Sequence, residues 1–207
     1  MTDESGTLGV AIPSDDLCLA YVNTRYWRGT PTPTETLHGI ADVAHWLADS
    51  APAAAPLAER GAAHWQARPE EADLAHAAAI GLREVLHRVL AAAAAGAVPD
   101  LSSLNVALGQ AAPRRRLVCD GGAFGWQMEV LPPSAALLLS GVLWSAADLL
   151  VGPRRTRLRA CANPKCGWLF LDDSKSGNRR WCAMSACGNR AKAHRHYLRT
   201  KAARAVP

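Results

Sequence analysis

The sequence contains no apolar segment long enough to cross a membrane. Its longest apolar stretch, residues 135–151, is interrupted by two serines and Asp148, whereas a membrane span needs about 20 predominantly apolar residues. The first seven residues, MTDESGT, lack the basic start and apolar middle of a secretory signal. We therefore expect a cytoplasmic protein without a membrane partner, and a buried helix over the apolar stretch.

The sequence also lacks internal repeats and the composition of a disordered, collagen-like or coiled-coil protein. Of its 207 residues, 49% are hydrophobic and 20% are charged, which is typical of a chain that folds around a core. This length allows one large domain, or a medium-sized domain with a small appended module.

Acidic residues are scarce in the last quarter of the chain. Residues 1–151 carry 9 Lys and Arg against 16 Asp and Glu, a net charge of −7, whereas residues 152–207 carry 14 against 2, a net charge of +12. Because this segment has few acidic partners of its own, its natural partner is a polyanion, although charge alone would also fit a solvated basic tail. Composition and charge change together near residues 152–155, so we place a linker there between domains 1–151 and 152–207.

The first 151 residues show mainly the apolar periodicity of helices. In residues 69–96, apolar side chains recur at spacings of three and four, which predicts a long amphipathic helix. Similar patterns predict helices over residues 15–27, 34–49, 100–110 and 132–151. The Ala- and Pro-rich residues 50–56 fit either a loop or the start of a helix.

One β-hairpin is predicted within this helical part. Residues 116–120 and 125–131 alternate in side-chain type around Gly121 and Gly122, which is typical of two strands joined by a tight turn. We therefore expect a mainly α-helical N-terminal domain with one small β-hairpin.

Only six cysteines are present, and four of them lie in the basic segment as two CxxxxC pairs separated by fifteen residues. In a reducing compartment this pairing favours metal ligation over disulfides. Four thiolates at about 2.3 Å complete a tetrahedral Zn²⁺ site and leave no open position for catalysis. We predict one structural Zn²⁺ on Cys161, Cys166, Cys182 and Cys187. The alternatives are an iron–sulfur cluster, which uses the same ligands, and four thiols without a metal.

Turn and helix signals around these cysteines predict a treble-clef-like module made of a short hairpin and a helix. Pro164 and Gly167 supply a tight turn, and residues 168–171 have the pattern of the following strand. Cys187 opens a predicted helix over residues 188–203, where the positive end of the helix dipole favours a thiolate. The two remaining cysteines, Cys18 and Cys119, stand in apolar surroundings and are predicted to be core residues.

The segment RWCAMSACGNRAKAHRHY (residues 180–197), preceded by CANPKCGWLFLDDS, resembles a CGNR zinc finger. The N-terminal part resembles the ABATE domain at LAYVNTR (residues 19–25), at WL (residues 46–47) and at SSLNVAL (residues 102–108). This resemblance covers nearly the whole chain. It implies a bacterial stress-induced transcription regulator, with zinc on the four cysteines and DNA as the target of the finger. The chain has Ala20 where the family pattern often has an acidic residue, so we assign no ligand role there.

Basic side chains gather on the predicted C-terminal helix and in the loop before it. At about 100° per residue, Lys192, Arg195 and Arg199 share one face of the helix, and such a surface fits several phosphate contacts. The predicted DNA-contacting residues are Arg179, Arg180, Arg190, Lys192, Arg195, His196 and Arg199. Arg180 and Arg190 have an alternative role, because a zinc ion with four thiolates carries a formal charge of −2 that they would neutralise. They could also pair with Asp172 or Asp173.

These patterns together predict a DNA-binding transcription regulator rather than an enzyme, whose helical part senses a signal or forms a homodimer. The alternative is a zinc-stabilised module that binds RNA or an acidic protein. A nuclease with a second metal on Asp172, Asp173, His194 and His196 is a third hypothesis, but no nucleophile or open metal position supports it. The polar run Asn23 to Arg25 fits either a site for a small-molecule effector or a helix cap with buried hydrogen bonds.

Overall fold

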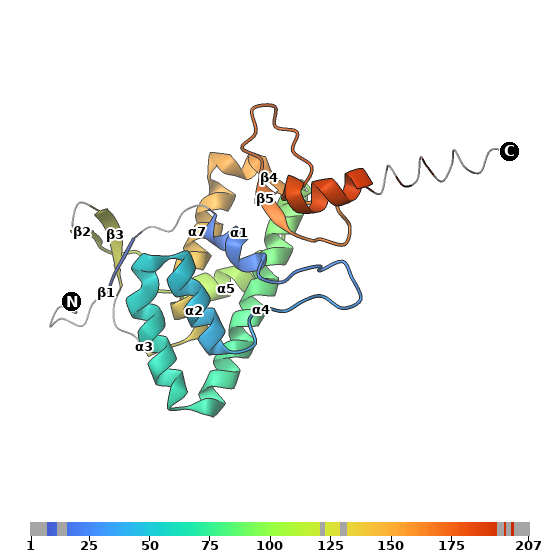
Figure 1. Ribbon diagram of the computed structural model, residues 1–207. Coiled ribbons are helices and arrows are strands. Elements are labelled where there is room, and N and C mark those ends of the chain that lie inside the picture. Colours follow the sequence, from blue (N-terminus) through green and yellow to red (C-terminus); the bar gives the residue numbers. More distant parts are fainter. Residues whose placement is uncertain are drawn as a thin grey trace.

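The protein is a helical body that carries a small cysteine-rich module at one end (Figure 1). The computed structural model describes residues 8–11, 16–120, 123–128, 132–193, 197 and 200. The helices are α1 (Leu17–Val22), α2 (Ile40–Ser50), α3 (Ala55–Gln66), α4 (Pro69–Ala94), α5 (Ser102–Gln110), α6 (Ala135–Leu138) and α7 (Ser140–Val151). None of the described helices is both long enough and apolar enough to cross a membrane.

The central element is α4, which contacts all the other helices of the body. It begins with Pro69 at its first position and two glutamates in its first turn, both of which favour a helix start. Its residues Leu86, Val89 and Leu90 are completely or almost completely buried in the core. The helix confirms the prediction made from the apolar periodicity of residues 69–96.

The other predicted helices exist, but they are shorter than their apolar patterns. Residues 23–36 form a loop between α1 and α2 instead of extending either helix. The segment 132–151 is divided at Leu139 into α6 and α7. The first of these helices is capped by Ser134, whose hydroxyl accepts a hydrogen bond from the Leu137 N–H at 3.1 Å. Of the two alternatives for residues 50–56, the structure shows the start of a helix: Pro52–Ala54 form a 3-10 turn, and α3 begins at Ala55.

The predicted hairpin is confirmed as β2 (Leu117–Asp120) and β3 (Ala123–Met128). A third strand, β1 (Leu8–Ala11), pairs antiparallel with the other edge of β3 and was not predicted. The prediction that Cys119 is a core residue is wrong, because it lies on the edge strand β2 and is exposed. Cys18 on α1 is fully buried, as predicted.

A second, two-stranded sheet follows α7. A 3-10 turn, Pro153–Arg157, occupies the region where a linker was expected and leads into β4 (Leu158–Ala160). This strand pairs antiparallel with β5 (Leu169–Leu171), which confirms the strand predicted there. Leu158, Leu169 and Leu171 are buried in the same core as the helices, so this hairpin is a continuation of the helical body.

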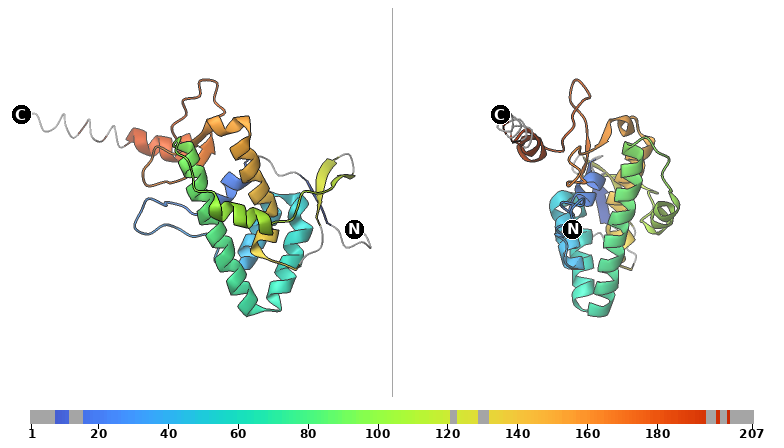
Figure 2. Two further views of the ribbon diagram at one scale, coloured as in Figure 1. Left: turned by 180° about the vertical axis from the view of Figure 1, so that it is seen from behind. Right: turned by 90° about the vertical axis from the view of Figure 1, so that its right-hand side faces the viewer.

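The last described element is a short helix that projects from the module (Figure 2). It begins as a π-helical turn, Met184–Gly188, and continues as α-helix over residues 189–193. Most of the remaining part of the predicted helix 188–203 lies outside the described residues.

Candidate metal centre and nucleic-acid interface

The sulfur atoms of four cysteines converge in the C-terminal module. The Sγ atoms of Cys161, Cys166, Cys182 and Cys187 all lie within 4.8 Å of one another, and none of these cysteines forms a disulfide. The Sγ atoms of Cys166 and Cys182 are 3.7 Å apart, and those of Cys182 and Cys187 are 3.8 Å apart. A tetrahedron of sulfurs at about 2.3 Å from a metal has edges of about 3.8 Å. The arrangement therefore fits a single tetrahedral metal ion.

Tight backbone turns bring the first two cysteines together. Cys161 directly follows β4, and its N–H donates to the Trp168 carbonyl at 2.9 Å. The Cys166 N–H donates back to the Asn163 carbonyl at 2.9 Å, which closes the turn. Gly167 then takes a φ of 73°, a left-handed conformation that glycine adopts without strain. The CxxxxC spacing thus folds into a knuckle, residues 161–168, that points both sulfurs inward.

The second pair of cysteines is held by the loop before the short helix and by its π-helical turn. Cys187 lies within this turn, and the next residue donates its N–H to the Ala183 carbonyl at 3.1 Å. The Asn163 side-chain amide donates to the Cys187 Sγ at 3.4 Å. This bond links the knuckle to the second pair of cysteines.

The surroundings of Cys166 and Cys182 oppose the ionisation of their thiols. Burial raises the pKa of Cys166 to about 12 and raises the pKa of Cys182 as well. Burial also opposes ionisation of Cys161, but hydrogen bonds, led by those from the backbone of Cys182 and Asn163, hold its pKa below the ordinary value. A bound cation reverses this balance, because coordination stabilises the thiolate form. The donor set is therefore suited to a divalent metal.

The predicted DNA-contacting residues occupy different environments. The Arg179 guanidinium donates to the carbonyls of Trp181 and Cys182 and lies 4.6 Å from the centre of the Phe170 ring. Arg180 lies 5.5 Å from the centre of the Trp181 ring, and both partners belong to the finger. The side chains of Arg180 and Lys192 are exposed.

Arg190, in contrast, reaches a residue far away in the sequence. Its guanidinium carbon lies 4.3 Å from the centre of the Trp27 ring, in the loop that follows α1. Three further predicted contacts, Arg195, His196 and Arg199, lie outside the described residues, as does His194.

The two aspartates of the module have other partners than Arg180 and Arg190. Asp172 accepts hydrogen bonds from Ser174 and from the Arg179 N–H, and these bonds lower its pKa. Asp173 pairs with Arg157 and Arg154, each at 3.0 Å, and this pairing lowers its pKa. Among the described residues, the four cysteines are the only group of three or more metal-ligating side chains that converge.

The contact between the finger and the helical body was missed by sequence reasoning. The Asn23 side chain at the end of α1 donates to the Leu169 carbonyl at 2.8 Å and accepts from the Leu169 N–H at 3.0 Å. The His87 ring on α4 lies 2.7 Å from the Gly167 carbonyl. Asn23 therefore pairs with a strand edge of the finger, a backbone partner that no sequence motif identifies.

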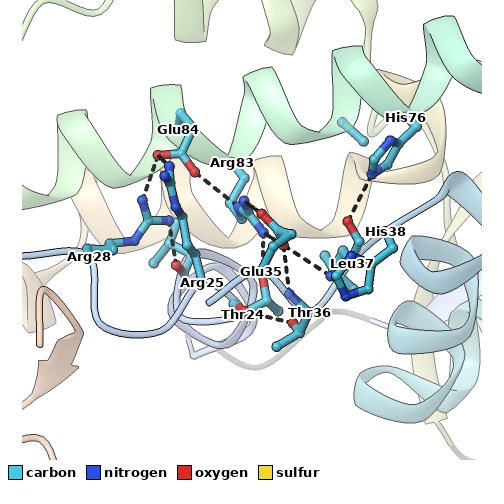
Figure 3. A network of polar contacts seen from close by, with 12 residues as sticks. Thr24, Arg25, Arg28, Glu35, Thr36, Leu37, His38, His76, Arg83 and Glu84 are labelled. Atoms are coloured by element: carbon cyan, nitrogen blue, oxygen red, sulfur yellow. Dashed lines mark hydrogen bonds and ion pairs between the residues drawn. The ribbon is translucent and has the colours of Figure 1, made fainter. Parts of the chain in front are cut away.

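The loop of residues 23–36, which we call the strap, is anchored by a partly buried ion network (Figure 3). Arg83 on α4 is fully buried and pairs through both of its terminal nitrogens with the Glu35 carboxylate. Its Nε donates to Glu84 at 3.1 Å, and Glu84 accepts from Arg28 at 2.6 Å. Burial tends to raise the pKa of Glu35, but pairing with Arg83 outweighs it and lowers the pKa to about 2. The strap is thereby fixed to α4 near its middle, at Arg28, and near its C-terminal end, at Glu35.

Two family models together match nearly the whole chain. The model of the ABATE family, described as "Putative stress-induced transcription regulator", matches residues 15–153. The CGNR zinc finger model matches residues 157–200, which include all four converging cysteines. No curated protein matches the chain. The two matches confirm the resemblance that was predicted from the cysteine, CGNR and LAYVNTR segments.

Proposed function

Because the chain belongs to the ABATE family and ends in a CGNR zinc finger, we propose that it is a DNA-binding transcription regulator whose finger is built on one Zn²⁺. The observation that carries this proposal is the convergence of four cysteine sulfurs at the base of a short helix in the most basic part of the chain. The helical body senses a signal or joins two copies of the chain, and no catalytic step takes part.

The ligands of the proposed zinc ion are Cys161, Cys166, Cys182 and Cys187. Sulfur separations of 3.7 and 3.8 Å suit one shared ion, whereas an iron–sulfur cluster is several atoms wide and would hold its cysteines farther apart. Four thiolates close the coordination sphere, so the ion has a structural role. It fixes the knuckle and the start of the short helix to each other.

The proposed DNA surface is the outer side of the finger. Arg180 and Lys192 are exposed there, and we assign phosphate contacts to them and to the predicted residues Arg195, His196 and Arg199. We assign Arg179 a supporting role, because its guanidinium donates to two carbonyls of the finger's own loop. Phosphate contacts position a protein on DNA without reading its sequence, so this surface accounts for affinity rather than specificity.

The experiment is a fluorescence-anisotropy titration of the full chain with labelled duplex DNA at several salt concentrations. We expect a linear fall of log K with log salt, with a slope of about −0.9 per phosphate contact. Lys192→Ala removes about 0.9 from that slope, whereas Arg60→Ala, an exposed residue of α3 on the helical body, leaves it unchanged.

Three further measurements test the proposal. A chelator releases the metal and is expected to abolish the salt-sensitive binding. Purified protein without bound metal would contradict the zinc site. Tighter binding of single-stranded RNA or of an acidic protein than of duplex DNA would replace the DNA target by the corresponding partner.

A further inference from the structure

Trp27 has an unusual backbone conformation in the middle of the strap. It is the only described residue other than glycine with a positive φ, at 56°. This left-handed region is unfavourable for a bulky side chain and persists only where the surrounding structure imposes it. Thr30 supports the turn, because its N–H and its hydroxyl both donate to the Trp27 carbonyl, at 2.9 and 2.7 Å.

The two residues that follow Trp27 fix its position. The Arg28 side chain donates to Glu84 on α4 at 2.6 Å and to the Val22 carbonyl on α1 at 2.9 Å. The backbone N–H groups of Arg28 and Gly29 donate to the carbonyls of Cys166 and Lys165, at 3.1 and 3.3 Å. The strap is therefore bonded to the helical body on one side and to the zinc knuckle on the other.

The Trp27 ring contacts Arg190, the first basic residue of the short helix over residues 184–193, which we call the finger helix. The Arg190 guanidinium carbon lies 4.3 Å from the centre of the Trp27 ring, well within the range of a cation–π contact. The strap and the finger helix project from the same side of the molecule (Figures 1 and 2). The four cysteines hold the helix at its first turn, and this stack adds a contact beyond the metal.

We propose that Trp27 is a positioning residue, which sets the direction of the finger helix by stacking on Arg190. In this role Arg190 is engaged with the helical body rather than with a phosphate, and the helical body controls the pose of the basic surface through the strap. The inference rests on the proposed function only where its test measures DNA binding. The position of the helix can be measured without DNA.

The test is hydrogen exchange of the amides of residues 188–193 in the full, zinc-loaded chain. Trp27→Ala and Arg190→Ala each remove the stack, and we expect exchange to become about three- to tenfold faster. Arg190 is exposed, so its replacement leaves the fold intact even if Trp27→Ala does not fold. Trp27→Phe keeps an aromatic face and is expected to restore most of the protection.

Arg180 provides the matched control, since it also lies over a tryptophan ring, but that ring belongs to the finger itself. Arg180→Ala is expected to leave exchange at residues 188–193 unchanged. Metal content measured on every variant separates a change of helix position from a loss of zinc.

DNA binding distinguishes a positioning role from a phosphate contact. Arg190→Lys keeps the charge but loses the planar stack, so we expect it to weaken binding about three- to tenfold, as Trp27→Ala does, without changing the salt slope. Unchanged exchange in both Trp27→Ala and Arg190→Ala would overturn the inference. It would also be overturned if Arg190→Lys bound like wild type while Arg190→Ala lost about 0.9 of the slope. If wild type binds no DNA, the proposed function fails and the exchange data still decide the role of Trp27.

Discussion

Arg83 and Glu35 show how single residues fix the strap to the helical body. Arg83 is completely buried and depends on the Glu35 carboxylate for its strongest pairing. Removing one partner of a buried ion pair typically costs about 3–5 kcal/mol. Because Glu84 remains in contact with Arg83, we expect Glu35→Gln to lower the free energy of unfolding by about 3 kcal/mol at pH 7, the lower end of that range. Urea unfolding followed by circular dichroism measures this loss.

The pairing of Glu35 with Arg83 also makes the effect of Glu35→Gln on the free energy of unfolding dependent on pH. The pKa of Glu35 is lowered from 4.5 to about 2 in the folded protein, so its ionised form stabilises the fold above pH 4.5. This contribution disappears as the pH falls from 4.5 toward 2, and the gap between wild type and Glu35→Gln should narrow over that range. Asp49→Asn, at an exposed pair with His45, serves as the control with little effect. A gap that stays constant down to pH 2 would contradict the assigned pairing.

At the scale of elements, the strap contacts the zinc knuckle so closely that only glycine fits at one position. A Cβ atom on Gly29 would lie 1.8 Å from the Pro164 carbonyl oxygen. Gly29→Ala must therefore separate the two backbones and break the bonds to Lys165 and Cys166. We expect a loss of about 1–3 kcal/mol in the free energy of unfolding, with faster exchange of the Arg28 and Gly29 amides.

The matched control is the same substitution at an open position of α4. A Cβ atom on Gly81 would meet no atom within 4 Å, and alanine is the better helix former by about 1 kcal/mol. Gly81→Ala is therefore expected to stabilise the protein, in the opposite direction to Gly29→Ala. Equal effects of the two substitutions would show that the strap does not rest on the knuckle as described.

At the scale of the whole molecule, the sequence predicted what local spacing encodes. The four cysteines, the long helix α4 and the hairpin β2–β3 all depend on residues that are near one another in the sequence or have distinctive chemistry. The contact between the strap and the finger could not be predicted in this way, because Asn23 pairs with backbone atoms 146 residues away. Strand β1 pairs with β3, which is far away in the sequence. Its four residues are too few to show the alternation of side chains that predicts a strand. Cys119 was misplaced because its apolar neighbours suggested a core position, whereas β2 is an outer strand of the sheet on which Leu117 is exposed as well.

The two parts of the finger pack in different hydrophobic clusters. We therefore predict that removal of the metal unfolds one part, the knuckle and the short helix, and leaves the hairpin β4–β5 folded. The hairpin β4–β5 buries three leucines in the core of the helical body, and Asn23 holds its second strand by two hydrogen bonds. The knuckle and the short helix, in contrast, share a small cluster made mainly of the cysteines and Phe170. We therefore expect chelation under reducing conditions to bring the amides of residues 162–168 and 182–193 close to the exchange rates of an unfolded peptide. The amides of β4 and β5 keep their protection.

Cysteine variants separate loss of the metal from a general effect of the chelator. Cys182→Ser removes one of the four converging sulfurs and should reproduce the exchange pattern of the chelated protein. Cys119→Ser, at an exposed cysteine on β2, should exchange like wild type. If β4 and β5 opened together with the knuckle, the hairpin would depend on the metal rather than on the helical body. If residues 182–193 kept their protection after chelation, the metal would not hold the finger helix, and the strap together with the contact between Trp27 and Arg190 would have to carry that role alone.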